Sequence, residues 1–265
     1  MILKERICIT FALAATMVLT LGTPAVLAND DDDDEVPFPV AVMIIELTEE
    51  DIEIQFFADG HWGHFQIEDP NDRLAFRGTA RRKLRRQNGV SEIFFASVPS
   101  HYLEEEPNFD EPIEDFLARW PEGIYEFESW SLDGDDYESE VYFSHLMPDL
   151  PEITSPVSAT DEPVEVSADL PLLIDWEPVT EDFLNGDPVS IMEYQVIVDQ
   201  VEPERDNGWV DGNTRRALVN VPGDITEFTL GAEFLASGTE YEFEILAIEM
   251  NGNATISVGE FVTSE

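Results

Sequence analysis

Residues 240–248 predict a strand with one buried face, and this strand constrains the fold of the chain more than any other segment. Apolar side chains stand at every second position from Tyr241 to Ala247, and the positions between them carry glutamates and a leucine. A Ser-Gly-Thr turn at 237–239 comes just before the strand. A glycine-containing turn followed by a tyrosine is the pattern of a tyrosine corner, in which the hydroxyl hydrogen-bonds to the upstream backbone. The segment therefore predicts a core strand of a β-sandwich.

The hundred or so residues around this strand carry seven plausible strands separated by turn signals, which predicts an immunoglobulin-like sandwich. Residues 151–265 resemble a fibronectin type III domain in the order and spacing of Trp176-Glu177-Pro178, the strand at Tyr194, Leu235, Gly238-Thr239, Tyr241 and Ala247. The resemblance implies a two-sheet sandwich. Integrin-binding members of that family carry Arg-Gly-Asp in the last hairpin loop, where this chain has Asn251-Gly252-Asn253. The resemblance therefore does not imply that adhesive activity.

Residues 37–150 predict a second, β-rich domain with one short helix. The helix is expected at about 112–120, because acids occupy its first turn, apolar residues recur on one face, and Pro121 stops it. Two runs of alternating residues on either side of Asp133-Gly134 are typical of a hairpin. Further short apolar runs predict strands at 40–47, 52–56, 64–67 and 93–96.

The whole chain is thus expected to be mainly β, with two β-sandwich-like domains at 37–150 and 151–265. It resembles exported bacterial proteins that contain a fibronectin type III domain. The N-terminal part of this resemblance lies in the run from Phe116 to Phe127 and in Ser144-His145, and it implies no particular activity.

Residues 1–28 have the pattern of a secretory signal peptide: a basic-leaning head, an apolar run and small residues before a cleavage point after Ala28. The alternative is that the same run stays as an N-terminal anchor. An acidic run at 29–36 predicts a disordered spacer. The single cysteine, Cys8, lies inside the signal, so no disulfide or thiolate chemistry is expected after cleavage. The protein is expected to be periplasmic or secreted, with no later membrane span.

The chain is strongly acidic, with 58 acidic and 13 basic residues and a formal net charge of −45. Such a surface repels nucleic acid and anionic lipid and attracts divalent cations and polycations. Two explanations stay open: adaptation to a saline medium, where salt screens self-repulsion, and a cation-binding role with weak affinity for Ca²⁺. Nucleic acid is not an expected partner.

Candidate metal ligands occur at Asp59, His61 and His64. The strand before them is expected to end at Asp59-Gly60, so that the two histidines lie in a hairpin loop, where a spacing of three residues does not force them together. A zinc-protease helix would also need a glutamate between the histidines. No metal or other cofactor is therefore expected.

Signals of catalysis are missing from the sequence. No Gly-x-Ser-x-Gly elbow, phosphate loop or dinucleotide fingerprint occurs. Carboxylates are so abundant that pairs of them nominate no glycosidase site. The chain is not expected to be an enzyme, and no catalytic residue is nominated.

The basic residues gather in one segment of an otherwise acidic chain. Seven of the 13 arginines and lysines lie between Arg73 and Arg86. Two explanations stay open: contact with an anionic partner, including self-association through charge complementarity, and neutralisation by acids of the same domain. The candidate partner-binding residues are Arg77, Arg81, Arg82, Lys83, Arg85 and Arg86.

These features favour a non-catalytic, exported binding or structural module whose partner is a protein or a glycan. A calcium-responsive surface protein is the alternative, and an accessory domain of a hydrolase is a third possibility.

Overall fold

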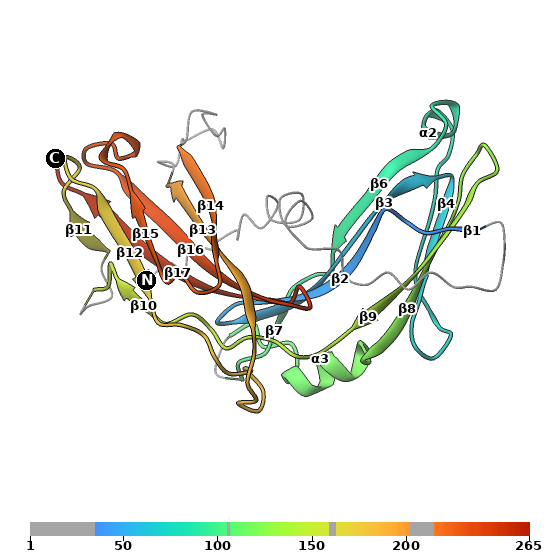
Figure 1. Cartoon of the computed structure of the whole chain (residues 1–265), viewed down its shortest axis with the longest axis horizontal. Helices are drawn as coiled ribbons and strands as arrows, with labels where there is room; N and C mark the ends of the chain where they lie inside the picture. The colour runs from blue at the N-terminus through green and yellow to red at the C-terminus, as the bar shows by residue number, and fades with distance from the viewer. Residues whose placement is uncertain (1–34, 105–106, 159–162, 202–214) are drawn as a thin grey trace. The chain divides into compact units, whose positions relative to one another are not determined.

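The computed structural model describes residues 35–104, 107–158, 163–201 and 215–265, which form two compact units (Figure 1). Unit 1 contains Glu53–His145 together with the described residues up to Ile44, and unit 2 contains Leu146–Glu265 together with Ile45–Ile52. The predicted signal peptide and residues 29–34 of the acidic run lie outside the described residues. Within the described part of the chain, no helix is long and apolar enough to cross a membrane.

Unit 2 is a sandwich of two sheets, as predicted, and its strands are antiparallel apart from β11, which pairs in parallel with β17. Its elements are β10 (Ile153–Ser155), β11 (Val164–Val166), β12 (Leu172–Trp176), β13 (Ile191–Gln200), β14 (Arg216–Pro222), β15 (Glu227–Leu230), η2 (Ala232–Phe234), β16 (Glu240–Glu249) and β17 (Ala254–Thr263). One sheet has the order β10-β12-β15, and the other contains β14-β13-β16-β17. A three-stranded sheet facing a four-stranded one is the arrangement of a fibronectin type III sandwich, so the resemblance is confirmed at the level of fold.

The tyrosine corner is confirmed in atomic detail. The Tyr241 side chain is buried, and its ring stacks on Phe261 with centroids 5.0 Å apart. Its hydroxyl oxygen accepts a hydrogen bond from the Ala236 N–H at 2.8 Å and donates to the Phe234 carbonyl at 3.4 Å. The hydroxyl therefore ties the turn before β16 to the core of unit 2.

The four-stranded sheet of unit 2 gains a short parallel partner from early in the chain. In the segment Ile45–Ile52, Glu46 pairs with Ala254 and Leu47 pairs with Thr255 of β17. The Ile45 N–H donates to the Asn253 side-chain oxygen at 2.8 Å. A run of residues from the N-terminal half thus completes the sheet edge at β17.

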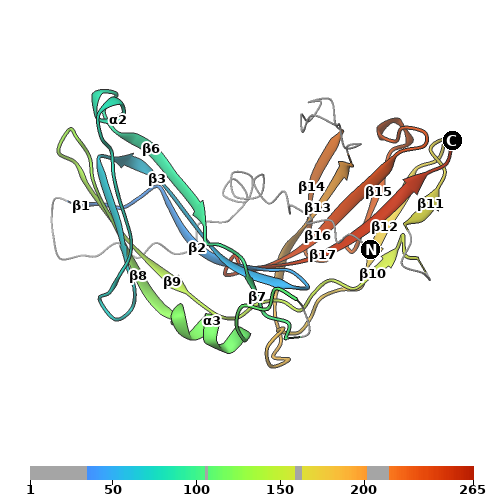
Figure 2. The same cartoon turned by 180° about the vertical axis from the view of Figure 1, so that it is seen from behind.

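Unit 1 also has two sheets, which Figures 1 and 2 show as two layers. Its elements are β1 (Glu35–Val36), β2 (Val40–Leu47, through Ile44), β3 (Asp51–Trp62, from Glu53), β4 (His64–Glu68), β5 (Leu74–Thr79), α2 (Lys83–Arg86), β6 (Val90–Ala96), β7 (Ser100–His101), α3 (Ile113–Arg119), β8 (Gly123–Trp130) and β9 (Asp136–Phe143). One sheet has the order β1-β9-β8-β4-β5, and β2, β3 and β6 form the other layer. The expected mainly β fold and the helix near 112–120 are confirmed, with α3 as that helix.

Aromatic rings fill the space between the two layers of unit 1. Phe95 of β6 meets Phe76 of β5 with ring centroids 4.4 Å apart, and Phe56 of β3 meets Phe127 of β8 at 6.3 Å. Each such pair adds about 0.5–1.5 kcal/mol beyond the burial of its area. Since the inward-facing side of each sheet is occupied in this way, the polar residues that alternate with these rings lie on the outer faces.

The prediction that the second strand ends at Asp59-Gly60 was wrong, because β3 continues to Trp62. Glycine occurs at position 60 for a steric reason, because a Cβ atom there would lie 2.8 Å from a ring carbon of Phe38. Gly60 therefore marks a close approach of a side chain to the strand and not a turn. The chain instead changes sheets at Gly63, between β3 and β4.

Candidate functional site

The basic segment forms the connection between the two sheets of unit 1, at the end where β5 leads into β6 (Figure 1). We call residues 81–86 the basic loop. Arg81 and Arg82 lead into the single turn of α2, which holds Lys83, Arg85 and Arg86. The sequence patterns predicted neither β5 nor α2, because both are largely exposed and carry no apolar periodicity.

The basic loop is held at both of its ends. On one side, the backbone N–H of the buried Ala80 donates to the Gly63 carbonyl at 2.8 Å. On the other, the Asn88 amide hydrogen-bonds to the Asp133 carboxylate in the β8–β9 turn. Gly89 follows with φ +102°, and a Cβ atom there would lie 2.4 Å from the Trp62 carbonyl oxygen. Glycine is thus required at this position, and the loop conformation is set by its neighbours.

All five cations of the basic loop are exposed to solvent. None of Arg81, Arg82, Lys83, Arg85 and Arg86 forms an ion pair with an acid in the described part of the chain. The explanation by internal neutralisation therefore has no support among these residues. Charges that neighbours do not neutralise are available to an external anion.

Arg77 has a different environment from the other candidate residues. It lies in β5, and its guanidinium donates to the Gln66 side-chain oxygen at 2.7 Å. The Gln66 amide in turn donates to Glu128 at 2.5 Å. Arg77 therefore belongs to the outer face of the five-stranded sheet and not to the basic loop.

The same outer face carries a block of glutamates on three adjacent strands. In the register, Glu68 of β4 lies opposite Glu126 of β8, Glu126 lies opposite Glu140 of β9, and Glu128 lies opposite Glu138. We call these five residues the glutamate face. In the part of the chain that the structure describes, no cation forms an ion pair with four of them: Glu68, Glu126, Glu128 and Glu140.

Partial burial and the crowding of like charges both act on Glu126, in the middle of this face. The pKa of the Glu126 carboxyl is raised above its usual value, first by partial burial and then by the charges of neighbouring acids, among them Glu128, Glu68 and Glu140. A carboxylate with no cation beside it and several acids around it favours the approach of a positive group.

The candidate metal ligands lie at the change of sheets. Asp59 and His61 belong to β3, whereas His64 begins β4. The His64 ring packs on Trp130 at 5.3 Å, and its Nδ1 lies 2.9 Å from the Thr79 hydroxyl. Within the described residues, no group of three or more His, Cys, Asp or Glu side chains is arranged to hold a metal ion.

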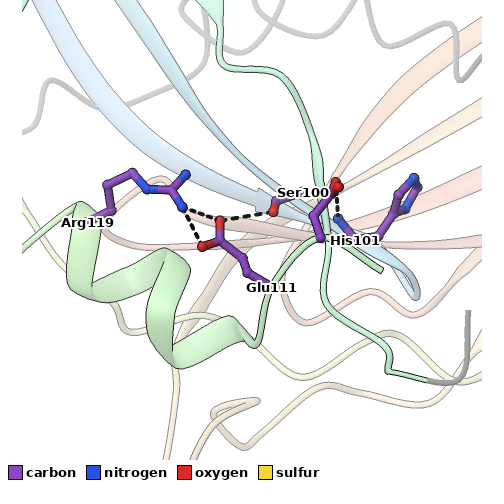
Figure 3. A network of polar contacts seen from close by, with 5 residues as sticks. Ser100, His101, Glu111 and Arg119 are labelled. Carbon is purple, nitrogen blue, oxygen red and sulfur yellow. Dashed lines mark hydrogen bonds and ion pairs between the residues drawn. The ribbon is translucent and has the colours of Figure 1, made fainter. Parts of the chain in front are cut away.

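A second polar cluster joins the loop after β6 to helix α3 (Figure 3). The Ser100 hydroxyl donates to the Glu111 carboxylate at 3.1 Å, and Arg119 forms an ion pair with the same carboxylate. Figure 3 shows the His101 ring pointing away from this carboxylate and from the Ser100 hydroxyl. The cluster connects β7 to α3 and has the arrangement of a structural contact.

Comparison with known proteins finds solved structures at low identity and low TM-score. No family model and no curated protein matches the chain. Among solved structures, the FN1–FN3 domains of chicken CNTN1 are 14% identical with a TM-score of 0.35, covering 87% of this chain and 69% of theirs. A two-domain fibronectin type III segment of chicken tenascin is 10% identical with a TM-score of 0.29, covering 84% and 99%. The fn3 domain of human collagen alpha-1(XX) is 19% identical with a TM-score of 0.26, covering 42% and 90%. Likenesses of this size say nothing about a partner.

Proposed function

We propose that this protein is an exported, non-catalytic binding module that meets a carboxylate-rich macromolecule through its basic loop. The observation that carries the proposal is the set of five exposed cations that form no ion pair with a described residue. Export rests on the signal-peptide pattern of residues 1–28.

The chemistry of the loop suits carboxylates. Four of its five cations are arginines, whose planar guanidinium groups bind a carboxylate through two parallel hydrogen bonds. The loop is also held in place before binding, by Ala80 on one side and by Asn88 and Gly89 on the other. A pre-formed loop loses less conformational entropy when it binds than a free segment does.

The net charge of the chain limits the range over which the loop attracts an anion. At about 0.15 M salt the screening length is roughly 8 Å, so the many acids elsewhere are largely screened from an anion that touches the loop. Binding is therefore expected at physiological salt and not in very dilute buffer, where repulsion by the whole chain of charge −45 dominates.

The test measures binding of the full chain to immobilised poly-L-glutamate, as a protein carboxylate, and to polygalacturonate, as a glycan carboxylate. We expect the loop variant Arg81→Gln plus Arg85→Gln to bind about tenfold more weakly than the wild type, since each exposed ion pair contributes up to about 1 kcal/mol. The control variant Arg73→Gln plus Arg215→Gln removes the same charge outside the basic loop and is expected to bind as the wild type does. Equal binding by the wild type and the loop variant, or equal losses in both variants, would contradict the proposal.

A further inference from the structure

We propose that the carboxylate-rich partner of the basic loop is a second copy of this chain, which receives the loop on its glutamate face. The inference rests on the proposed function, because it identifies the partner of the same loop. Two surfaces of opposite charge in unit 1 carry it. Neither the five cations of the basic loop nor four members of the glutamate face, Glu68, Glu126, Glu128 and Glu140, form an ion pair with a described residue.

The two surfaces match in size. The carboxylates of the glutamate face lie in two rows, one with Glu128 and Glu138 and one with Glu68, Glu126 and Glu140. Residues two apart on a strand are about 7 Å apart, and neighbouring strands are about 4.8 Å apart. The basic loop from Arg82 to Arg86 includes the turn of α2, which spans about 6 Å at 1.5 Å per residue. The cations are therefore spaced to reach both rows.

The cations of the basic loop form no ion pair with the glutamate face of their own copy in the described part of the chain. Between them lies the row in which Thr79, His64 and Trp130 stand opposite one another. The nearer row of glutamates, which contains Glu128, is two residues from the row of Trp130, or about 7 Å along the strands. The basic loop begins on the opposite side of the row of Trp130. We therefore assign the pairing of loop and face to two molecules.

The contact joins different surfaces of the two copies. The loop lies at the tip of unit 1, where β5 leads into β6 (Figure 2). The strand register instead places the glutamates side by side on the outer face of β4, β8 and β9. A contact between unlike surfaces leaves one loop and one face free at the ends of a pair, so further copies can add.

Salt dependence distinguishes this contact from an apolar one. At about 0.01 M salt the screening length is roughly 30 Å, so repulsion between the total charges keeps the copies apart. At about 1 M salt the screening length is roughly 3 Å, so the ion pairs between loop and face weaken. Association is expected to pass through a maximum between these limits.

The test is sedimentation velocity of the full chain at about 0.15 M salt, over a range of protein concentrations. We expect the wild type to form dimers and larger species as its concentration rises. The loop variant Arg81→Gln plus Arg85→Gln and the face variant Glu126→Gln plus Glu140→Gln are each expected to remain monomeric over the same range. An equimolar mixture of these two variants is expected to form dimers and nothing larger, because one contributes the only intact face and the other the only intact loop.

Two further variants serve as controls. Glu114→Gln plus Asp115→Asn, on the exposed side of α3, removes the same charge as the face variant and is expected to associate as the wild type does. Deletion of residues 29–34 removes the acidic run near the N-terminus and is also expected to leave association unchanged. Loss of association in the deletion, with association retained in the face variant, would overturn the assignment to the glutamate face.

Failure of this inference can be told apart from failure of the proposed function. A wild type that stays monomeric but still binds poly-L-glutamate through its basic loop would overturn the second copy as partner and leave the proposed function standing. A mixture of loop and face variants that does not associate, beside a wild type that does, would also overturn the loop-to-face contact.

Discussion

We expect Glu244→Gln to stabilise unit 2 at pH 8 by about 3 kcal/mol and to leave its stability near pH 4 unchanged. Partial burial, followed by the charges of Glu242 and Asp199, raises the pKa of the Glu244 carboxyl from 4.5 to about 7, while Arg216 acts in the opposite direction. A difference of about 2.5 pKa units corresponds to about 3 kcal/mol.

The sign of the pH dependence follows from the raised value. Below pH 4.5 the carboxyl is protonated in both the folded and the unfolded chain, so it does not favour unfolding. Between pH 4.5 and 7 the unfolded chain releases a proton that the folded chain still holds, because the folded chain would otherwise carry the charge in a poorly solvated place. Stability therefore falls across this interval and levels off above pH 7. Glutamine keeps the shape of the side chain and never ionises, so it removes this loss.

The groups that face Glu244 come from three strands. Glu242 lies on β16 itself, Asp199 on β13, and Arg216 on β14, where it forms an ion pair with Asp199 at 3.5 Å. On the other side, the residue of β17 opposite Glu244 is the uncharged Val258.

Urea unfolding of the wild type and the Glu244→Gln variant at pH 4 and pH 8 measures the effect. The difference between the two proteins isolates residue 244, although many other carboxyls titrate over this range. A variant with the same advantage at both pH values, or with none at pH 8, would show that Glu244 is ordinarily solvated.

Tyr241→Phe is expected to lower the stability of unit 2 by about 1–3 kcal/mol, because removal of the buried hydroxyl leaves a partly buried donor without its acceptor. The Ala236 N–H, which donates to the Tyr241 oxygen at 2.8 Å, loses this bond while the ring itself still packs on Phe261. The loss therefore comes from hydrogen bonding and not from packing.

Thermal and urea unfolding of Tyr241→Phe measure this loss, and Tyr142→Phe is the matched control. Tyr142 is 68% exposed on the outer face of unit 1, so its variant is expected to change stability by less than about 0.5 kcal/mol. Equal effects of the two substitutions would mean that the corner hydroxyl contributes nothing.

The fold of unit 2 could be predicted from the sequence because its signals are local. The period of two around Tyr241 and the turn at 237–239 specify a strand and its entry, and neither depends on distant residues. The pairing of Ile45–Ile52 with β17 could not be predicted, since an apolar run indicates a strand but not its partner. The strand end predicted at Asp59-Gly60 was wrong for a similar reason, because the glycine is explained only by the close approach of Phe38, which the sequence does not show.

Of the two charged surfaces, only the basic loop could be predicted from the sequence. The run of arginines stands out by composition, but whether nearby acids neutralise it depends on the tertiary structure. The glutamate face gave no signal at all, because its members are separated by up to 72 positions between Glu68 and Glu140 and meet only through strand register. In a chain with 58 acids, no single glutamate stands out.

Hydrogen–deuterium exchange of the backbone amides of residues 83–89, with and without bound poly-L-glutamate, tests the role of the basic loop most directly. These amides belong to a helix of a single turn and its cap, where Arg86 N–H bonds to the Arg82 carbonyl at 3.1 Å, and so short a helix exchanges rapidly when free. We expect slower exchange in this segment when the polyanion is bound. Unchanged exchange here, with protection appearing elsewhere in the chain, would contradict it.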